Sequence, residues 1–139
     1  MKKLKLLSIV FFIFFGFQSF AQDEWIVPEK YAYTLNPTFE SNFLSLGKGL
    51  YTKYCQSCHG KEGYGDGKIS KKLRGDVCDF SIDQFQTQPD GVIFYKMTFG
   101  RNDMPMHLKQ LPNDIDRWLL VNYIRTLSLA DIKKAQEKE

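Results

Sequence analysis

Apolar side chains recur at helical spacing in three separate parts of the 139-residue chain, which predicts three helices. The first spans about residues 45–54 and the second about residues 90–99. Asp90 is expected to cap the second helix, and Gly100 to end it. The third helix is expected to begin near Asn113, whose side chain can cap it.

The third predicted helix carries two apolar stripes, where a surface helix carries one. They are Ile115, Trp118 and Leu119, and then Leu120, Tyr123, Ile124 and Leu127. We expect one side to pack on the first helix and the other to line an internal pocket. Gly47 and Gly49 of the first helix lack a Cβ and would allow this close approach, with a frayed first turn as the alternative reason for them.

The first 21 residues have the pattern of a secretory signal peptide. Three lysines precede an apolar run from Leu6 to Phe17, and small residues follow at Ser19 and Ala21. The run is short for a membrane span, and an uncleaved membrane anchor is the alternative. Those three lysines account for the whole formal net charge of +3. The rest of the chain is formally neutral, so the composition gives no indication of nucleic-acid binding.

Two further segments flank the predicted helical domain of residues 45–128. Residues 22–44 contain Pro28, Pro37 and many aromatic side chains, and they are too apolar for a plain linker. We expect this arm to pack over the domain surface, with a docking face for a partner as the alternative. Residues 129–139 form a highly charged tail, which we expect to be solvated helix or a frayed end.

The sequence Cys55-Gln56-Ser57-Cys58-His59 follows the first helix and reads C-x-x-C-H, the attachment sequence of a c-type haem. Two thiols three positions apart lie on one side of a helical turn, from which both can add to the vinyl groups of one porphyrin. His59 can then ligate the iron, which leaves the opposite face for a second ligand. A signal peptide agrees with this motif, because haem is attached to c-type cytochromes outside the cytoplasm.

Three other interpretations of the motif compete. A structural zinc site needs four convergent ligands, and the third cysteine, Cys78, is distant in sequence. A thioredoxin-like dithiol needs a neighbouring βαβ pattern, which is not visible. A Cys55–Cys58 disulfide in a haem-free exported module does not explain His59. Cys78 itself is expected to be a buried free thiol, with a disulfide to a partner as the alternative.

A polar loop after the second helix supplies candidates for the second iron ligand. Met104 is followed by Pro105, whose fixed φ would hold the thioether in place. A thioether is a soft, neutral ligand that suits haem iron. Met106 and His107 are the alternative ligands, although for His107 we favour a position at the surface.

The segment between the motif and the second helix is rich in glycine and in basic residues. The stretch Gly63–Gly67 lacks the G-K-[ST] ending of a phosphate loop, so close approach to a flat porphyrin edge explains it better. A basic cluster follows, made of Lys68, Lys71, Lys72 and Arg74. It is either a solvated face or a surface that steers an acidic partner.

The chain resembles the small bacterial monohaem class I cytochromes c over roughly residues 45–128. The matching residues are Gly47, Tyr51 and Cys55-x-x-Cys58-His59-Gly60, then Gly65-Asp66-Gly67, then Gly100 with Met104-Pro105, and finally Asp116-Arg117-Trp118 with Tyr123-Ile124-Arg125 and Leu127. The resemblance implies an all-α cytochrome c fold of three to four short helices wrapped around one haem c. It also implies thioethers at Cys55 and Cys58, proximal ligation by His59 and distal ligation by Met104.

Ligation by His59 and Met104 would fill both axial positions of the iron, so that a substrate has to displace a ligand to reach it. Methionine also raises the reduction potential relative to two imidazoles. We therefore expect a periplasmic one-electron carrier of a respiratory chain. We expect it not to be an enzyme and to meet redox partner proteins, as a monomer or as a haem subunit of a larger membrane redox complex. The alternative is a haem enzyme or gas-binding protein with an open sixth site.

Overall fold

The computed structural model describes residues 25–37 and 43–128. This part of the chain is helical and contains no β-strand, which confirms the predicted all-α class. Its elements are α2 (Glu29–Ala32), α3 (Leu44–Tyr54), α4 (Gln56–His59), the 3-10 helix η2 (Ser70–Lys72), α5 (Asp83–Gln86), α6 (Asp90–Phe99) and α7 (Asp114–Arg125). The three long helices are the three that the sequence predicts, and the others are single turns that position loops.

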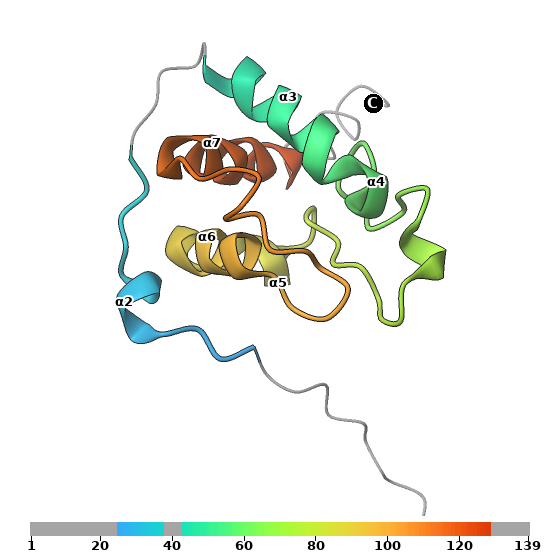
Figure 1. Cartoon of the computed structure of the whole chain (residues 1–139), viewed down its shortest axis with the longest axis horizontal. Helices are drawn as coiled ribbons and strands as arrows, with labels where there is room; N and C mark the ends of the chain where they lie inside the picture. Colours follow the sequence, from blue (N-terminus) through green and yellow to red (C-terminus); the bar gives the residue numbers. More distant parts are fainter. Residues whose placement is uncertain (1–24, 38–42, 129–139) are drawn as a thin grey trace, which may run out of the picture.

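Helix α7 lies between α3 and α6 and forms the centre of the molecule (Figure 1). A Cβ added at Gly47 would lie 2.4 Å from the carbonyl oxygen of Leu119, so the two helices cross there with their backbones in contact. Beside the crossing, the rings of Tyr51 and Tyr123 have centroids 5.2 Å apart. The predicted crossing at Gly47 is confirmed. Gly49 has no described atom within 4 Å of such a Cβ, so close approach does not explain it.

Helix α6 is covered on two sides. Its core side buries Ile93, Phe94 and Met97, and the ring of Phe94 stacks on Trp118 of α7 with centroids 4.2 Å apart. The spacing of Val92, Tyr95 and Phe99 predicted the helix correctly, but Tyr95 and Phe99 face the arm and not the core. The ring of Tyr31 in α2 lies 4.8 Å from Tyr95 and 5.9 Å from Phe99.

The arm is anchored to the domain by a polar junction as well as by aromatic rings. Asp90 accepts hydrogen bonds from Asn36 Nδ2 at 2.6 Å and from Arg125 Nε at 2.7 Å. The prediction that Asp90 caps α6 is therefore wrong, since the cap residue is Pro89 and the Asp90 carboxylate faces the arm and α7. Tyr31 and Asn36 thus attach the arm to the domain, whereas Ile26, Tyr33 and Leu35 of the arm stay exposed.

The start of α7 shows one confirmed prediction and one error. Asn113 caps the helix, because its Oδ1 accepts a hydrogen bond from the backbone of Ile115 at 3.0 Å. The side chain of Ile115 is 53% exposed, so it does not belong to a buried stripe. Arg117 takes the inward position instead, and its guanidinium bonds the carbonyl of Leu111 and the carboxylate of Asp114.

The predicted signal peptide of residues 1–21 and the charged tail of residues 129–139 lie outside the described residues. None of the helices that the structure describes has both the length and the apolar character needed to cross a membrane.

Candidate haem-binding site

The C-x-x-C-H motif consists of Cys55, which follows the end of α3, and the single helical turn α4. The carbonyl oxygen of Cys55 accepts hydrogen bonds from the backbone of Cys58 at 3.1 Å and of His59 at 2.9 Å. This turn brings both sulfur atoms and the imidazole into one short segment, with Cys55 buried and Cys58 half-buried. No disulfide joins the cysteines, all three of which lie in the described part of the chain. Both thiols of the motif are therefore available to form thioethers.

The described residues do not bring together the ligands of a structural zinc site, which needs four. They contain no group of three or more His, Cys, Asp or Glu side chains placed to hold a metal ion. Burial raises the pKa of the Cys55 thiol to about 12, with a further contribution from the neighbouring Cys58.

The imidazole of His59 is held by the loop that follows α4. Its Nδ1 lies 3.3 Å from the carbonyl oxygen of Cys78, and its ring stacks on Phe80 with centroids 4.2 Å apart. A carbonyl oxygen can only accept, so Nδ1 is the donor, and Nε2 keeps the lone pair that an iron ligand needs. Burial lowers the pKa of His59 to about 4, an effect that the Cys78 carbonyl opposes and His107 reinforces. The imidazole is therefore neutral at pH 7.

Cys78 contributes to this arrangement through its backbone and not through its thiol. The residue is exposed, so the prediction of a buried thiol is wrong. Its Sγ contacts the carbonyl oxygen of Asp79 at 3.6 Å, while its own carbonyl faces His59. Every residue has a backbone carbonyl, so the sequence does not indicate which carbonyl orients His59.

The glycine-rich loop packs against the motif itself. A Cβ at Gly67 would lie 2.3 Å from the carbonyl oxygen of Ser57, and the amide of Gly67 donates to the carbonyl of Cys58 at 3.1 Å. Contact with the backbone of α4 thus requires glycine at position 67, and approach of the loop to a porphyrin edge stays a prediction. The loop consequently holds the α4 turn in place.

Met104 lies at the end of a small hairpin that follows α6. Gly100 ends the helix with φ +63°, and Arg101 and Met104 then exchange two backbone hydrogen bonds of 3.0 and 2.9 Å. A Cβ at Gly100 would lie 2.4 Å from the carbonyl oxygen of Met104, so the hairpin folds back directly on the helix end. Met104 packs against the buried core, whereas Met106 is 42% exposed. The geometry therefore favours Met104 over Met106 as a ligand.

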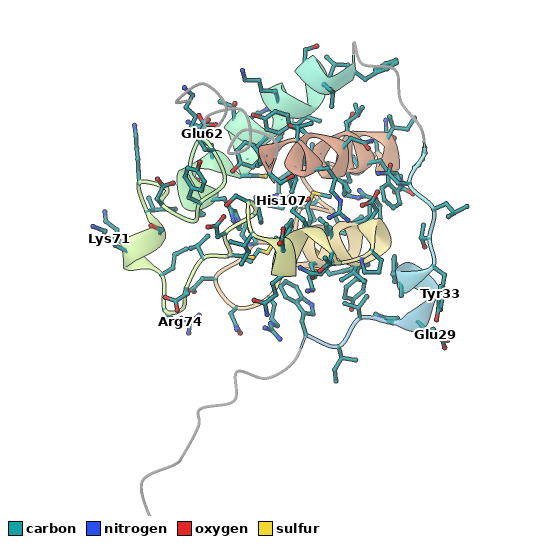
Figure 2. The ribbon with its side chains drawn as sticks, turned by 180° about the vertical axis from the view of Figure 1, so that it is seen from behind. Glu29, Tyr33, Glu62, Lys71, Arg74 and His107 are labelled. Atoms are coloured by element: carbon teal, nitrogen blue, oxygen red, sulfur yellow. The ribbon has the colours of Figure 1, made fainter. Side chains whose placement is uncertain are left out.

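His107 is buried, so the prediction that it lies at the surface is wrong. The amide of Leu108 donates to the carbonyl of Thr98 at 3.1 Å, and Leu111 donates to the carbonyl of His107 at 2.8 Å. These bonds tie the loop back onto α6 and turn the imidazole inward (Figure 2). The ring of His107 lies 6.1 Å from that of Tyr54, next to the motif.

Three buried polar atoms have no hydrogen-bond partner among the described residues: His107 Nδ1, Thr98 Oγ1 and Arg117 Nε. Such atoms are rare in folded proteins, and a bound group or a water can supply the partner. Of the three, His107 has its ring beside the motif, 6.1 Å from that of Tyr54. With the two thiols of the motif, the neutral His59 and the half-buried thioether of Met104, these surroundings fit a covalently attached haem.

The family comparison decides the class of the chain. The family model described as "Cytochrome C oxidase, cbb3-type, subunit III" matches residues 43–124. The chain belongs to this family of c-type cytochrome domains. The arm of residues 25–37 lies outside the matched region of the cytochrome, and the whole C-x-x-C-H motif lies inside it.

A solved structure adds support for this class of protein. The cytochrome is similar to a chain of the "Kuenenia stuttgartiensis reducing HAO-like protein complex Kustc0457/Kustc0458", with a TM-score of 0.60 and 28% sequence identity. The match covers 67% of the cytochrome and 47% of that chain, so the cytochrome spans about half the length of this relative. No curated protein matches the cytochrome.

Proposed function

We propose that this c-type cytochrome is a one-electron carrier that works outside the cytoplasm, in a respiratory chain, with His59 and Met104 as the axial ligands of one haem c. The observation that carries the proposal is the pair of loops on which these two side chains are held. The Cys78 carbonyl orients His59, and the Arg101–Met104 hairpin fixes Met104 against the end of α6. The haem would supply reversible transfer of one electron at its iron.

Each part of the chain would have a distinct task. Cys55 and Cys58 would hold the haem through thioethers, so the cofactor stays bound in both oxidation states. The hydrogen bond from His59 Nδ1 to Cys78 would fix the tautomer and orientation of the proximal ligand. The Met104 thioether would fill the other axial position and raise the reduction potential. With both positions filled, we propose that the protein is not an enzyme and takes no small-molecule substrate.

The partners would be redox proteins that meet the cytochrome through a small, weak interface. The exposed basic residues Lys68, Lys71 and Lys72 lie on the loop that is hydrogen-bonded to the motif through Ile69 and Ser57. They would attract an acidic surface. The solved relative comes from a protein complex, which supports a role as a haem subunit as the second form of the same function. The signal-like first 21 residues support a periplasmic location.

Carbon monoxide distinguishes a carrier from an enzyme or gas-binding protein. Ferrous holo-protein with both axial positions filled is expected to bind carbon monoxide negligibly at neutral pH. The Met104→Ala protein, with one position open, is expected to bind it readily. Ready binding by the wild-type protein would instead support the open-site alternative and contradict the proposed carrier.

A further inference from the structure

The loops that hold the two proposed ligands are joined to each other by one ion pair. Residues 60–82 carry the carbonyl that orients His59, and residues 100–107 carry Met104. Arg74 of the first loop reaches Asp103 of the second, although 29 positions separate them in sequence. Asp103 directly precedes Met104, so this contact acts on the residue next to the proposed distal ligand.

Several hydrogen bonds join Arg74 to Asp103. The backbone amide of Arg74 donates to Asp103 Oδ2 at 2.7 Å, and its guanidinium NH2 donates to Oδ1 at 2.8 Å. The Nε of Arg74 lies 3.2 and 3.3 Å from the two carboxylate oxygens. Charged, two-pronged contacts of this kind are the strongest hydrogen bonds between side chains and fix orientation as well as distance. Because the backbone amide of Arg74 also donates, the Asp103 carboxylate is bound to the main chain of the loop as well as to the flexible Arg74 side chain.

The hairpin that bears Met104 is held by contacts from other parts of the chain as well as by its own backbone. Its own backbone contributes two hydrogen bonds, between Arg101 and Met104, and its turn includes Asn102 at φ +54°, a left-handed value that asparagine tolerates. Outside contacts reach the hairpin on two sides. The ring of Trp25 lies 4.6 Å below the guanidinium of Arg101, and Arg74 holds Asp103.

We propose that the Arg74–Asp103 pair is a latch that holds the Met104 hairpin closed and sets how often Met104 leaves the iron. Arg74 and Asp103 are then positioning residues, which act through Met104 and do not touch the haem iron. The inference rests on the proposed ligation by Met104. It goes beyond that proposal by naming the contact that controls how often Met104 dissociates from the iron. Figure 2 shows Arg74 at the edge of the molecule, where salt can reach the pair.

The test is the rate at which imidazole, a small external ligand, binds to the ferric holo-protein, followed by the shift of the Soret band. Binding requires Met104 to leave, so its limiting rate at high imidazole reports opening of the hairpin. Arg74→Ala and Asp103→Asn are each expected to raise this rate roughly three- to tenfold. The double variant is expected to be no faster than the faster single variant, because the two residues form one contact.

Lys61→Ala is the matched control, because it removes the same charge from the same loop at an exposed position. It is expected to leave the rate unchanged. Added salt should raise the wild-type rate toward that of Arg74→Ala and leave the variant almost unaffected, since an exposed ion pair is screened. A general loss of stability would not produce this salt pattern, and thermal unfolding of each variant measures such a loss separately.

The outcomes separate this proposal from the proposed function. A wild-type ferric spectrum with the red charge-transfer band of bound methionine, together with the same opening rate in Arg74→Ala and Lys61→Ala, would overturn the latch alone. Rate increases that multiply in the double variant would also overturn it. A wild-type spectrum without that band would overturn ligation by Met104 and the latch with it.

Discussion

Gly47 of α3 lies so close to Leu119 of α7 that a Cβ at position 47 would be 2.4 Å from the Leu119 carbonyl oxygen. The obstacle is backbone, which cannot rotate away as a side chain can. The crossing of the two helices is therefore set by the absence of one methyl group.

Gly47→Ala is expected to lower the free energy of unfolding by about 1–3 kcal/mol, because the helices have to move apart to admit the Cβ. Chemical denaturation followed by circular dichroism measures this change. Gly49→Ala is the matched control in the same helix, where the added Cβ meets no described atom. That variant is expected to gain roughly 0.5–1 kcal/mol, because alanine forms helix better than glycine. Equal effects of the two substitutions would contradict the proposed crossing.

Met104→Ala is expected to keep the haem covalently attached while opening the sixth position. The reduction potential should fall and the red charge-transfer band should disappear, since the thioether that favours ferrous iron is lost. Potentiometry and the visible spectrum measure both changes. Met106→Ala, which alters an exposed methionine two positions away, should leave both unchanged. If Met106→Ala abolishes the band and Met104→Ala does not, the ligand has been assigned to the wrong sulfur.

His107→Phe tests the remaining candidate ligand with an aromatic ring of similar bulk. The red band and the potential should stay close to the wild-type values if Met104 is the ligand. A wild-type spectrum without the band, together with a reduction potential that changes in His107→Phe and not in Met104→Ala, would assign the distal position to His107.

The same variant tests a pH effect. Burial lowers the pKa of His107 in the folded protein below its unfolded value. The neutral imidazole therefore stabilises the fold above the unfolded pKa of about 6.5, and this stabilisation is lost as the pH falls. Denaturation at a series of pH values between 7 and 5 should show a steeper loss of stability for the wild type than for His107→Phe. Parallel curves would mean that His107 is not held neutral by the fold.

Asp90→Ala is expected to destabilise the protein by about 1–3 kcal/mol, because Asn36 and Arg125 both lose a half-buried carboxylate partner. Limited proteolysis should then cut the arm near Asn36 faster than in the wild type. Asp83→Ala, at the exposed first residue of helix α5, removes the same charge and serves as the control. An arm equally resistant in both variants would show that the aromatic contacts alone hold it.

The sequence predicted the features of this cytochrome that depend on local pattern. The C-x-x-C-H motif, the helix that ends at Gly100 and the Asn113 cap are each encoded within a few residues. The crossing at Gly47 joins distant helices, but a glycine within a helical pattern indicated the close approach. Such features follow from helical spacing and from the chemistry of single side chains, so one sequence suffices to predict them.

The errors concern residues whose surroundings come from distant parts of the chain. His107 is buried because backbone hydrogen bonds fold its loop back onto α6, and no pattern near His107 encodes that contact. Asp90 looks like a cap, but Asn36 and Arg125 take its carboxylate. The Arg74–Asp103 contact was missed for the same reason, because it joins two loops that are far apart in sequence.

The visible spectrum of the protein exported together with haem-attachment machinery, recorded oxidised and reduced and extended into the red, tests the central claim most directly. A one-electron carrier with His59 and Met104 as ligands predicts sharp bands in the reduced state and the weak red band of bound methionine in the oxidised state. A haem spectrum without the red band would contradict ligation by Met104. Absence of any haem would contradict the whole account of the site and favour a haem-free module.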